Sequence, residues 1–121
     1  MENELTMYIF VNTDLKMKSG KIAAQVGHAA QEITEALVTM RFQNNGMLPD
    51  PYVRYFKWSK TGAKKIVLKA TQEQLIEMTK MRESVAITDA GRTQVKPGSL
   101  TVVGFYPSQC KGDFAKDYKL L

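Results

Sequence analysis

The 121 residues leave room for one modest hydrophobic core, so a single domain covering residues 1–121 is expected. Hydrophobic residues make up 44% and charged residues 24%, a globular composition that excludes a mainly disordered chain. The formal net charge of +5 favours a polyanionic partner such as nucleic acid but does not require one. One cysteine excludes an internal disulfide, no apolar run reaches the ~20 residues of a membrane span, and the acidic start does not resemble a targeting segment. We therefore expect a soluble cytoplasmic protein without membrane association.

Strand and helix patterns alternate from the start of the chain. Residues 6–11 form an apolar, β-branched and aromatic run, which is typical of a strand covered on both faces. A polar loop follows, and then Ser19 is a candidate N-cap for a long helix that ends near residue 44. The helix is predicted from an apolar stripe at helical spacing: Ile22, Val26, Ala29, Ile33, Leu37 and Met40. Asp50-Pro51 predicts a second helix that runs to about Lys60 and stops at Gly62.

The second half predicts three more strands and a third helix. Residues 65–69 form a buried strand, and Thr71-Gln72-Glu73-Gln74 has the spacing of a capping box at the start of a helix. Strands are predicted at 85–88 and 100–105, joined by a polar loop at 89–99, and the pattern after Pro107 predicts only a short helix. Strands separated by helices indicate an α/β fold, and the last two strands, joined without a helix, can pair antiparallel and make the sheet mixed.

The first predicted helix carries a polar stripe beside its apolar one, formed by Lys21, Gln25, His28 and Glu32. Such a stripe is usually a solvated helix edge. Here, however, Lys21 falls in the first turn and Lys18 just before it, where the helix dipole disfavours cations. Lysines at that end suit a site that binds phosphate, or an oxyanion formed during a reaction.

Other catalytic chemistries lack their motifs. Ser19-Gly20-Lys21 is no phosphate loop, because Leu15 stands where the motif needs glycine and Ile22 where it needs Ser or Thr. One histidine and one cysteine cannot assemble a zinc site of the usual ligand types, so neither a metal nor another cofactor is expected. No Gly-x-Ser-x-Gly elbow is present, and Cys110 is better explained as a structural or exposed thiol than as a nucleophile.

The second candidate segment is the loop that begins at Asp89, directly after a predicted buried strand. Arg92, Thr93 and Gln94 place a planar cation, a hydroxyl and an amide close together, and Gly91 permits a tight backbone path. An Asx-type turn capped by Asp89 explains the same residues equally well. From spacing alone, a turn and a functional site remain equal alternatives.

Together the segments 14–30 and 89–99 resemble the second type of peptidyl-tRNA hydrolase, the archaeal and eukaryotic family. They read Asp-Leu-Lys-Met-Lys-Ser-Gly-Lys-Ile-Ala-Ala-Gln-Val-Gly-His-Ala-Ala and Asp-Ala-Gly-Arg-Thr-Gln-Val-Lys-Pro-Gly-Ser. The resemblance extends over about residues 7–121. It implies a mixed four-stranded sheet flanked by helices on both faces, a homodimer, no metal, and hydrolysis of the ester between a peptide and the tRNA 3′ end.

The resemblance also implies roles for individual residues. Its catalytic positions fall on Lys21, His28, Asp89 and Thr93. Its substrate-binding positions fall on Lys18, Gln25, Arg92 and Gln94. In such a site Lys21 would stabilise the oxyanion, while Asp89 would either orient Lys21 or act as base towards water. The alternative is a non-catalytic basic RNA-binding or interaction module on the same fold, although a carboxylate such as Asp89 repels phosphate.

Overall fold

The structure of the protein, a computed structural model, describes residues 4–43, 45–90, 98–109 and 111–121. Its elements follow in the order β1 (Met7–Asn12), α1 (Ser19–Gln43), α2 (Asp50–Lys60), β2 (Lys65–Ala70), α3 (Gln72–Met78), β3 (Ser84–Thr88), β4 (Leu100–Phe105) and α4 (Gly112–Ala115). The predicted α/β fold with four strands is thus confirmed, and the short helix expected after Pro107 is α4.

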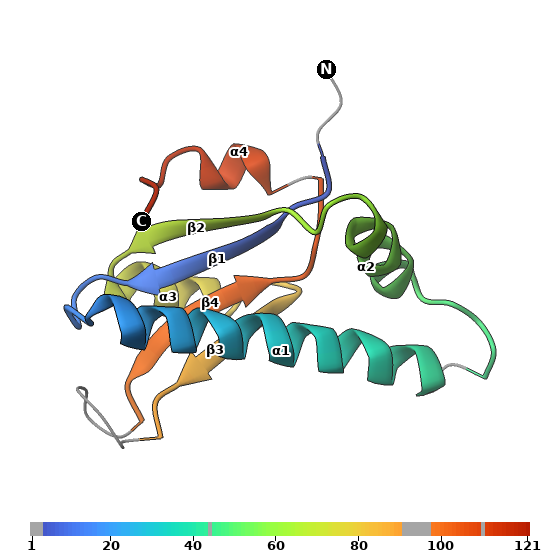
Figure 1. Cartoon of the computed structure of the whole chain (residues 1–121), viewed down its shortest axis with the longest axis horizontal. Helices are drawn as coiled ribbons and strands as arrows, with labels where there is room; N and C mark the ends of the chain where they lie inside the picture. Colours follow the sequence, from blue (N-terminus) through green and yellow to red (C-terminus); the bar gives the residue numbers. More distant parts are fainter. Residues whose placement is uncertain (1–3, 44, 91–97, 110) are drawn as a thin grey trace.

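The four strands form one sheet in the order β2-β1-β4-β3 (Figure 1). β1 pairs in parallel with β2, whereas β4 is antiparallel to both β1 and β3. The sheet is therefore mixed, as predicted. This topology places the carboxyl ends of β1, β2 and β3 at the same end of the sheet. The polypeptide leaving β1 enters α1 from that end, and the residue after β3 is Asp89.

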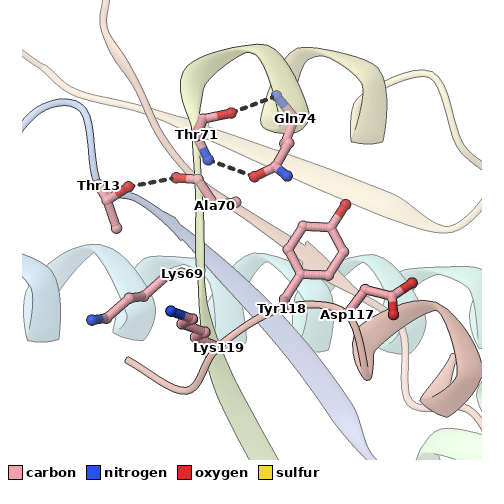
Figure 2. A pocket seen from close by; sticks show the side chains of 8 residues that line it. All are labelled: Thr13, Lys69, Ala70, Thr71, Gln74, Asp117, Tyr118 and Lys119. Carbon is pink, nitrogen blue, oxygen red and sulfur yellow. Dashed lines mark hydrogen bonds between the residues drawn. The ribbon is translucent and has the colours of Figure 1, made fainter.

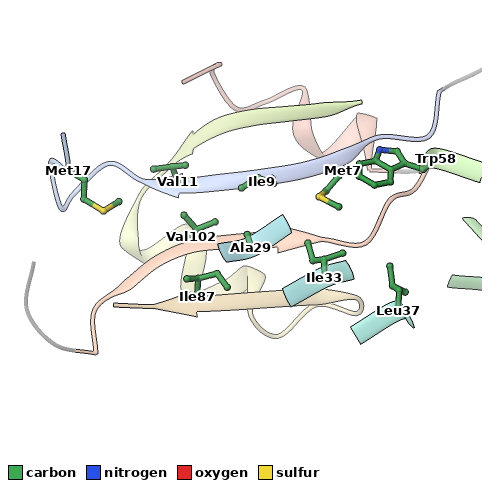
Figure 3. Packing of buried hydrophobic residues seen from close by; sticks show 10 residues of the cluster. All are labelled: Met7, Ile9, Val11, Met17, Ala29, Ile33, Leu37, Trp58, Ile87 and Val102. Atoms are coloured by element: carbon green, nitrogen blue, oxygen red, sulfur yellow. The ribbon is translucent and has the colours of Figure 1, made fainter. Parts of the chain in front are cut away.

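Helices cover both faces of the sheet, because the strands alternate their side chains between two buried clusters. Met7, Ile9 and Val11 of β1 point towards α1 and α2, where Trp58 closes the end of the cluster (Figure 3). Phe10 points to the opposite face, which α3 and α4 cover. The apolar stripe predicted for the first helix supplies this packing, although only its middle members Ala29, Ile33 and Leu37 are fully buried.

A glycine in β4 determines how closely α1 approaches the sheet. Gly104 lies on the face that α1 covers, and a Cβ atom at this position would come within 2.9 Å of Ile33 Cδ1 and 3.4 Å of Ala29 Cβ. With any larger residue, the Ile33 side chain or the helix itself would have to shift. The position of the first turn of α1 relative to the sheet edge therefore depends on this contact.

Element boundaries follow the sequence with two corrections at helix starts. The capping box of α3 is confirmed, with Thr71 Oγ1 accepting from Gln74 N–H at 3.2 Å and Gln74 Oε1 accepting from Thr71 N–H at 2.9 Å. Ser19 is the first helical residue of α1 rather than its N-cap, since the carbonyl of Lys18 already accepts from Ile22 N–H. Asp50 likewise lies inside α2, and its carboxylate binds Arg54 one turn later instead of capping backbone amides.

In the part of the chain that the structure describes, no helix combines the length and the apolar character needed to span a membrane.

Candidate active site

The two candidate segments meet at the end of the sheet where β1 and β3 terminate. Lys21 lies in the first turn of α1, which begins after the loop leaving β1, and Asp89 follows β3 directly. Lys21 Nζ donates to Asp89 Oδ1 across 68 residues of sequence. The first candidate segment and the start of the second are therefore in direct contact in the structure.

The Lys21–Asp89 ion pair is buried. The Lys21 side chain is 9% exposed and that of Asp89 only 2%. Two charges removed from water lose most of their hydration, and their mutual attraction offsets part of that loss. The first turn of α1 contains no acidic residue that would offset the helix dipole. The first-turn backbone amides of α1 therefore add positive potential beside the ion pair.

Backbone hydrogen bonds hold Asp89 from both sides. Its N–H donates to Ser99 O at 2.9 Å, and its carbonyl accepts from Gly98 N–H at 2.9 Å. Gly98 has φ of +82°, a left-handed conformation that glycine adopts without strain. Asp89 and Ser99 are thereby fixed opposite each other, and the carboxylate direction is set by the end of β3.

A second buried polar pair lies one helical turn further along α1. Gln25 is 4% exposed, and its Oε1 lies 2.6 Å from the hydroxyl of Thr101, which is fully buried in β4. The same hydroxyl lies 3.1 Å from Ile87 O, two residues before Asp89. Gln25 is therefore not part of a solvated stripe. Its contact ties α1 to β3 and β4 next to the Lys21–Asp89 pair.

Sequence reasoning missed two of these buried polar residues. Thr101 stands in an apolar run and reads as an ordinary β-branched strand residue. Asn12, 1% exposed, ends β1; its Nδ2 donates to Gln72 Oε1 at 2.6 Å and to Leu100 O at 2.8 Å, and its Oδ1 accepts from Asp14 N–H at 2.9 Å. A polar residue at the end of an apolar strand was the only sequence indication. Asn12 thus links the loop before α1 to the start of β4.

The remaining predicted site residues are less closely gathered. His28 is exposed and lies two turns along α1 from Lys21, roughly 10 Å by helical rise. Lys18 is exposed just before the helix. Arg92, Thr93 and Gln94 lie outside the described residues, so their predicted roles are untested. Among the described residues, no three His, Cys, Asp or Glu side chains come together as a possible metal site.

A lysine beside a helix N-terminus, held by a buried carboxylate, is an arrangement that can stabilise negative charge developing on a substrate. Comparison with known proteins identifies the family. The sequence profile described as peptidyl-tRNA hydrolase PTH2 matches residues 5–120. The chain belongs to this family, in agreement with the resemblance seen in its sequence.

Individual relatives agree with the family assignment. The peptidyl-tRNA hydrolase of Methanococcus maripaludis is 38% identical over 128 residues, which cover 93% of this chain and 96% of the relative. That of Thermoplasma acidophilum is 36% identical over 109 residues, 85% of each chain. The human mitochondrial peptidyl-tRNA hydrolase 2 is 38% identical over 110 residues. The match covers 86% of this chain but 56% of the human protein, so the chain spans about half the length of its mammalian relatives.

Proposed function

We propose that this protein hydrolyses peptidyl-tRNA, cleaving the ester between a peptide or N-acyl amino acid and the tRNA 3′ end to release free tRNA. Family membership over residues 5–120 supports the reaction class. The buried Lys21–Asp89 pair at the start of α1 is the structural observation that carries the proposal. In a module that only binds RNA, a buried carboxylate beside Lys21 would weaken the attraction of phosphate. Such a module therefore does not explain Asp89.

In this mechanism Lys21 stabilises the oxyanion that forms when water attacks the ester carbonyl. One such donor is often worth ~3–4 kcal/mol of transition-state stabilisation. Asp89 orients the ammonium, because Oδ1 of its nearly unexposed carboxylate already accepts from Lys21 Nζ. Orientation is thus its first role in this proposal. The alternative role of Asp89 is that of a base towards the attacking water.

Further residues assist the reaction, and two copies of the chain act together. His28 and Thr93 assist proton transfer and water placement. Lys18, Arg92 and Gln94 contact the substrate directly. Gln25, which is 4% exposed and bound to Thr101, supports this substrate-binding region from beneath. The protein acts in the cytoplasm, as its composition suggests, and as the homodimer that its resemblance to the family implies. Sedimentation at working concentration measures the oligomeric state directly.

The decisive experiment is a turnover assay with N-acetylated aminoacyl-tRNA in excess over enzyme. Many equivalents of free tRNA should appear per equivalent of protein, and Asp89→Asn should slow their release. A stoichiometric complex without release would contradict the proposal and favour the non-catalytic RNA-binding module.

A further inference from the structure

The last residues of the chain form a short ladder with β2 that places two lysines face to face. Lys69 N–H donates to Lys119 O at 2.8 Å, and Leu121 N–H donates to Val67 O at 3.0 Å. These bonds flank the antiparallel bridge between Leu68 and Leu120. Lys69 is therefore the direct cross-strand neighbour of Lys119.

Strand alternation fixes the face to which both lysines point. Val67 and Leu121, two positions away from them, line a groove with Ser19 and Ile22 of α1. Because side chains two residues apart share a face, Lys69 and Lys119 lie on the side of the sheet that α1 covers. They thus follow, one position further along that face, residues that share a groove with the first turn of α1, the turn that carries Lys21.

The two lysines also line a pocket of about 180 Å³ at the carboxyl end of β2, together with Thr13, Ala70, Thr71, Gln74, Asp117 and Tyr118. In Figure 2 both lysine side chains extend towards the same side of the pocket, and the Asp117 carboxylate points to the other side. Burial, and secondly the charge of Asp117, raise the pKa of the Tyr118 phenol above its usual value. The phenol is therefore neutral at physiological pH and adds no negative charge.

Folding alone does not explain this pair. Like charges directly opposite each other destabilise a ladder. Both side chains are exposed, and no ion pair of either with a carboxylate is present among the described residues. A bound anion would remove the repulsion. The pair lies at the same end of the sheet as the Lys21–Asp89 site, although β2 and β3 are its two outer strands.

We propose that Lys69 and Lys119 form a phosphate-binding subsite that holds the RNA backbone of the substrate next to the candidate active site. The identity of the RNA as the tRNA 3′ strand rests on the proposed function. The subsite supplies affinity and alignment of the leaving tRNA, and it takes no part in the chemical step.

The first test measures binding of fluorescently labelled deacylated tRNA as a function of salt concentration, so it does not depend on hydrolysis. Lys69→Gln with Lys119→Gln should weaken binding about 5- to 10-fold and lower the slope of log K against log salt by about one to two. Lys69→Arg with Lys119→Arg should keep both. The matched control is Lys57→Gln with Lys80→Gln, which removes the same charge from α2 and from the turn after α3 and should leave the affinity within about twofold.

The second test separates binding from chemistry. For N-acetylaminoacyl-tRNA the double Gln variant should raise KM with kcat nearly unchanged. N-acetylaminoacyl-adenosine is an ester of the same type without phosphates. With this substrate, kcat/KM of the double Gln variant should equal that of the wild type. The melting temperature should stay equal or rise, because a like-charge pair has been removed, whereas a merely structural pair would lower it.

Three results would overturn the subsite: equal tRNA affinity and salt slope in the double Gln variant, equal weakening in the control variant, or an equal loss with the adenosine ester. The proposed function fails separately. If the wild type does not turn over but the double Gln variant still binds tRNA more weakly, the subsite stands and the hydrolase proposal falls.

Discussion

A lysine in the first turn of a helix and a carboxylate buried beside it are each unfavourable alone and stabilise each other when paired. Lys21 opposes the dipole of α1, and Asp89 is removed from water at the end of β3. Replacing such a pair by apolar residues is often neutral or stabilising in a protein that needs only to fold. Its presence at the end of the sheet, beside other cations, fits the catalytic role that we propose for it.

Stability and activity should therefore respond differently to loss of this pair. Lys21→Met leaves the buried Asp89 carboxylate without its cation, and Asp89→Asn leaves the Lys21 ammonium without its anion. Each change should therefore lower stability, by as much as ~3–5 kcal/mol for Lys21→Met. Each should also lower kcat by ~10²-fold or more. The double variant should regain much of the stability, because no charge is left unpaired, but none of the kcat.

Thermal melts and single-turnover kinetics on the three variants check this. If Lys21 were only a phosphate contact and Asp89 only a turn cap, Lys21→Met would raise KM at constant kcat, and the effects of the two changes would add.

Thr101 offers a second residue-scale prediction. Thr101→Val keeps the shape but removes the hydroxyl near Gln25 Oε1, leaving a buried acceptor unpaired at a cost of ~1–3 kcal/mol. Because this contact fixes α1 next to Asp89, kcat should fall several-fold while tRNA affinity stays constant. Thr101→Ser retains the hydroxyl and is the matched control. Equal losses of kcat in the Val and Ser variants would show that the methyl group, not the hydrogen bond, matters.

At the scale of elements, strand and helix positions were predictable and the tertiary pairing of polar groups was not. Apolar periodicity located α1, and the capping box located the start of α3, since both patterns are local in sequence. Gln25 and Thr101 are 76 residues apart, and each alone looks ordinary. The Lys21–Asp89 pair was reached only through the resemblance of two segments to a family. From spacing alone a turn at Asp89 was as good an explanation.

The packing of α1 on β4 gives an element-scale prediction. Gly104→Ala places a Cβ atom 2.9 Å from Ile33 Cδ1, so it should destabilise the fold by about 1–3 kcal/mol through overpacking. Ile33→Val removes that methyl group and alone should cost about 0.5–1.5 kcal/mol. Combined, the two changes should cost less than their sum. Gly27→Ala, in open space on the same helix, should be neutral or stabilising by up to ~1 kcal/mol. Urea denaturation measures all four variants, and strict additivity would contradict the contact.

At the scale of the whole molecule, basic residues lie at both ends of the sheet. Lys16 and Lys18 lie at the end of the sheet that carries the candidate site. Lys64 and Lys65 lie at the opposite end, just before β2 and at its start. β2 runs between these two ends, and its 6 residues span roughly 20 Å by the strand rise. A charge distribution this wide suits contacts along an RNA backbone. It provides few groups for reading bases, and no RNA-binding aromatic motif was found in the sequence.

We therefore predict that tRNA binding is electrostatic and largely indifferent to RNA sequence. If about five phosphates are neutralised, log K should fall against log salt with a slope of about −4. Between 50 and 200 mM salt, a fourfold rise in concentration, the affinity should then fall by roughly 250-fold. Deacylated tRNAs of unrelated sequence should bind within about threefold of one another at fixed salt, because phosphate contacts carry no sequence information. Titrations of several tRNAs at a series of salt concentrations measure both quantities, with a neutral osmolyte as the control for viscosity and water activity. A flat salt response, or discrimination of a hundredfold among tRNA bodies, would require base-reading contacts that the described surface does not supply, and would contradict an electrostatic mode of binding.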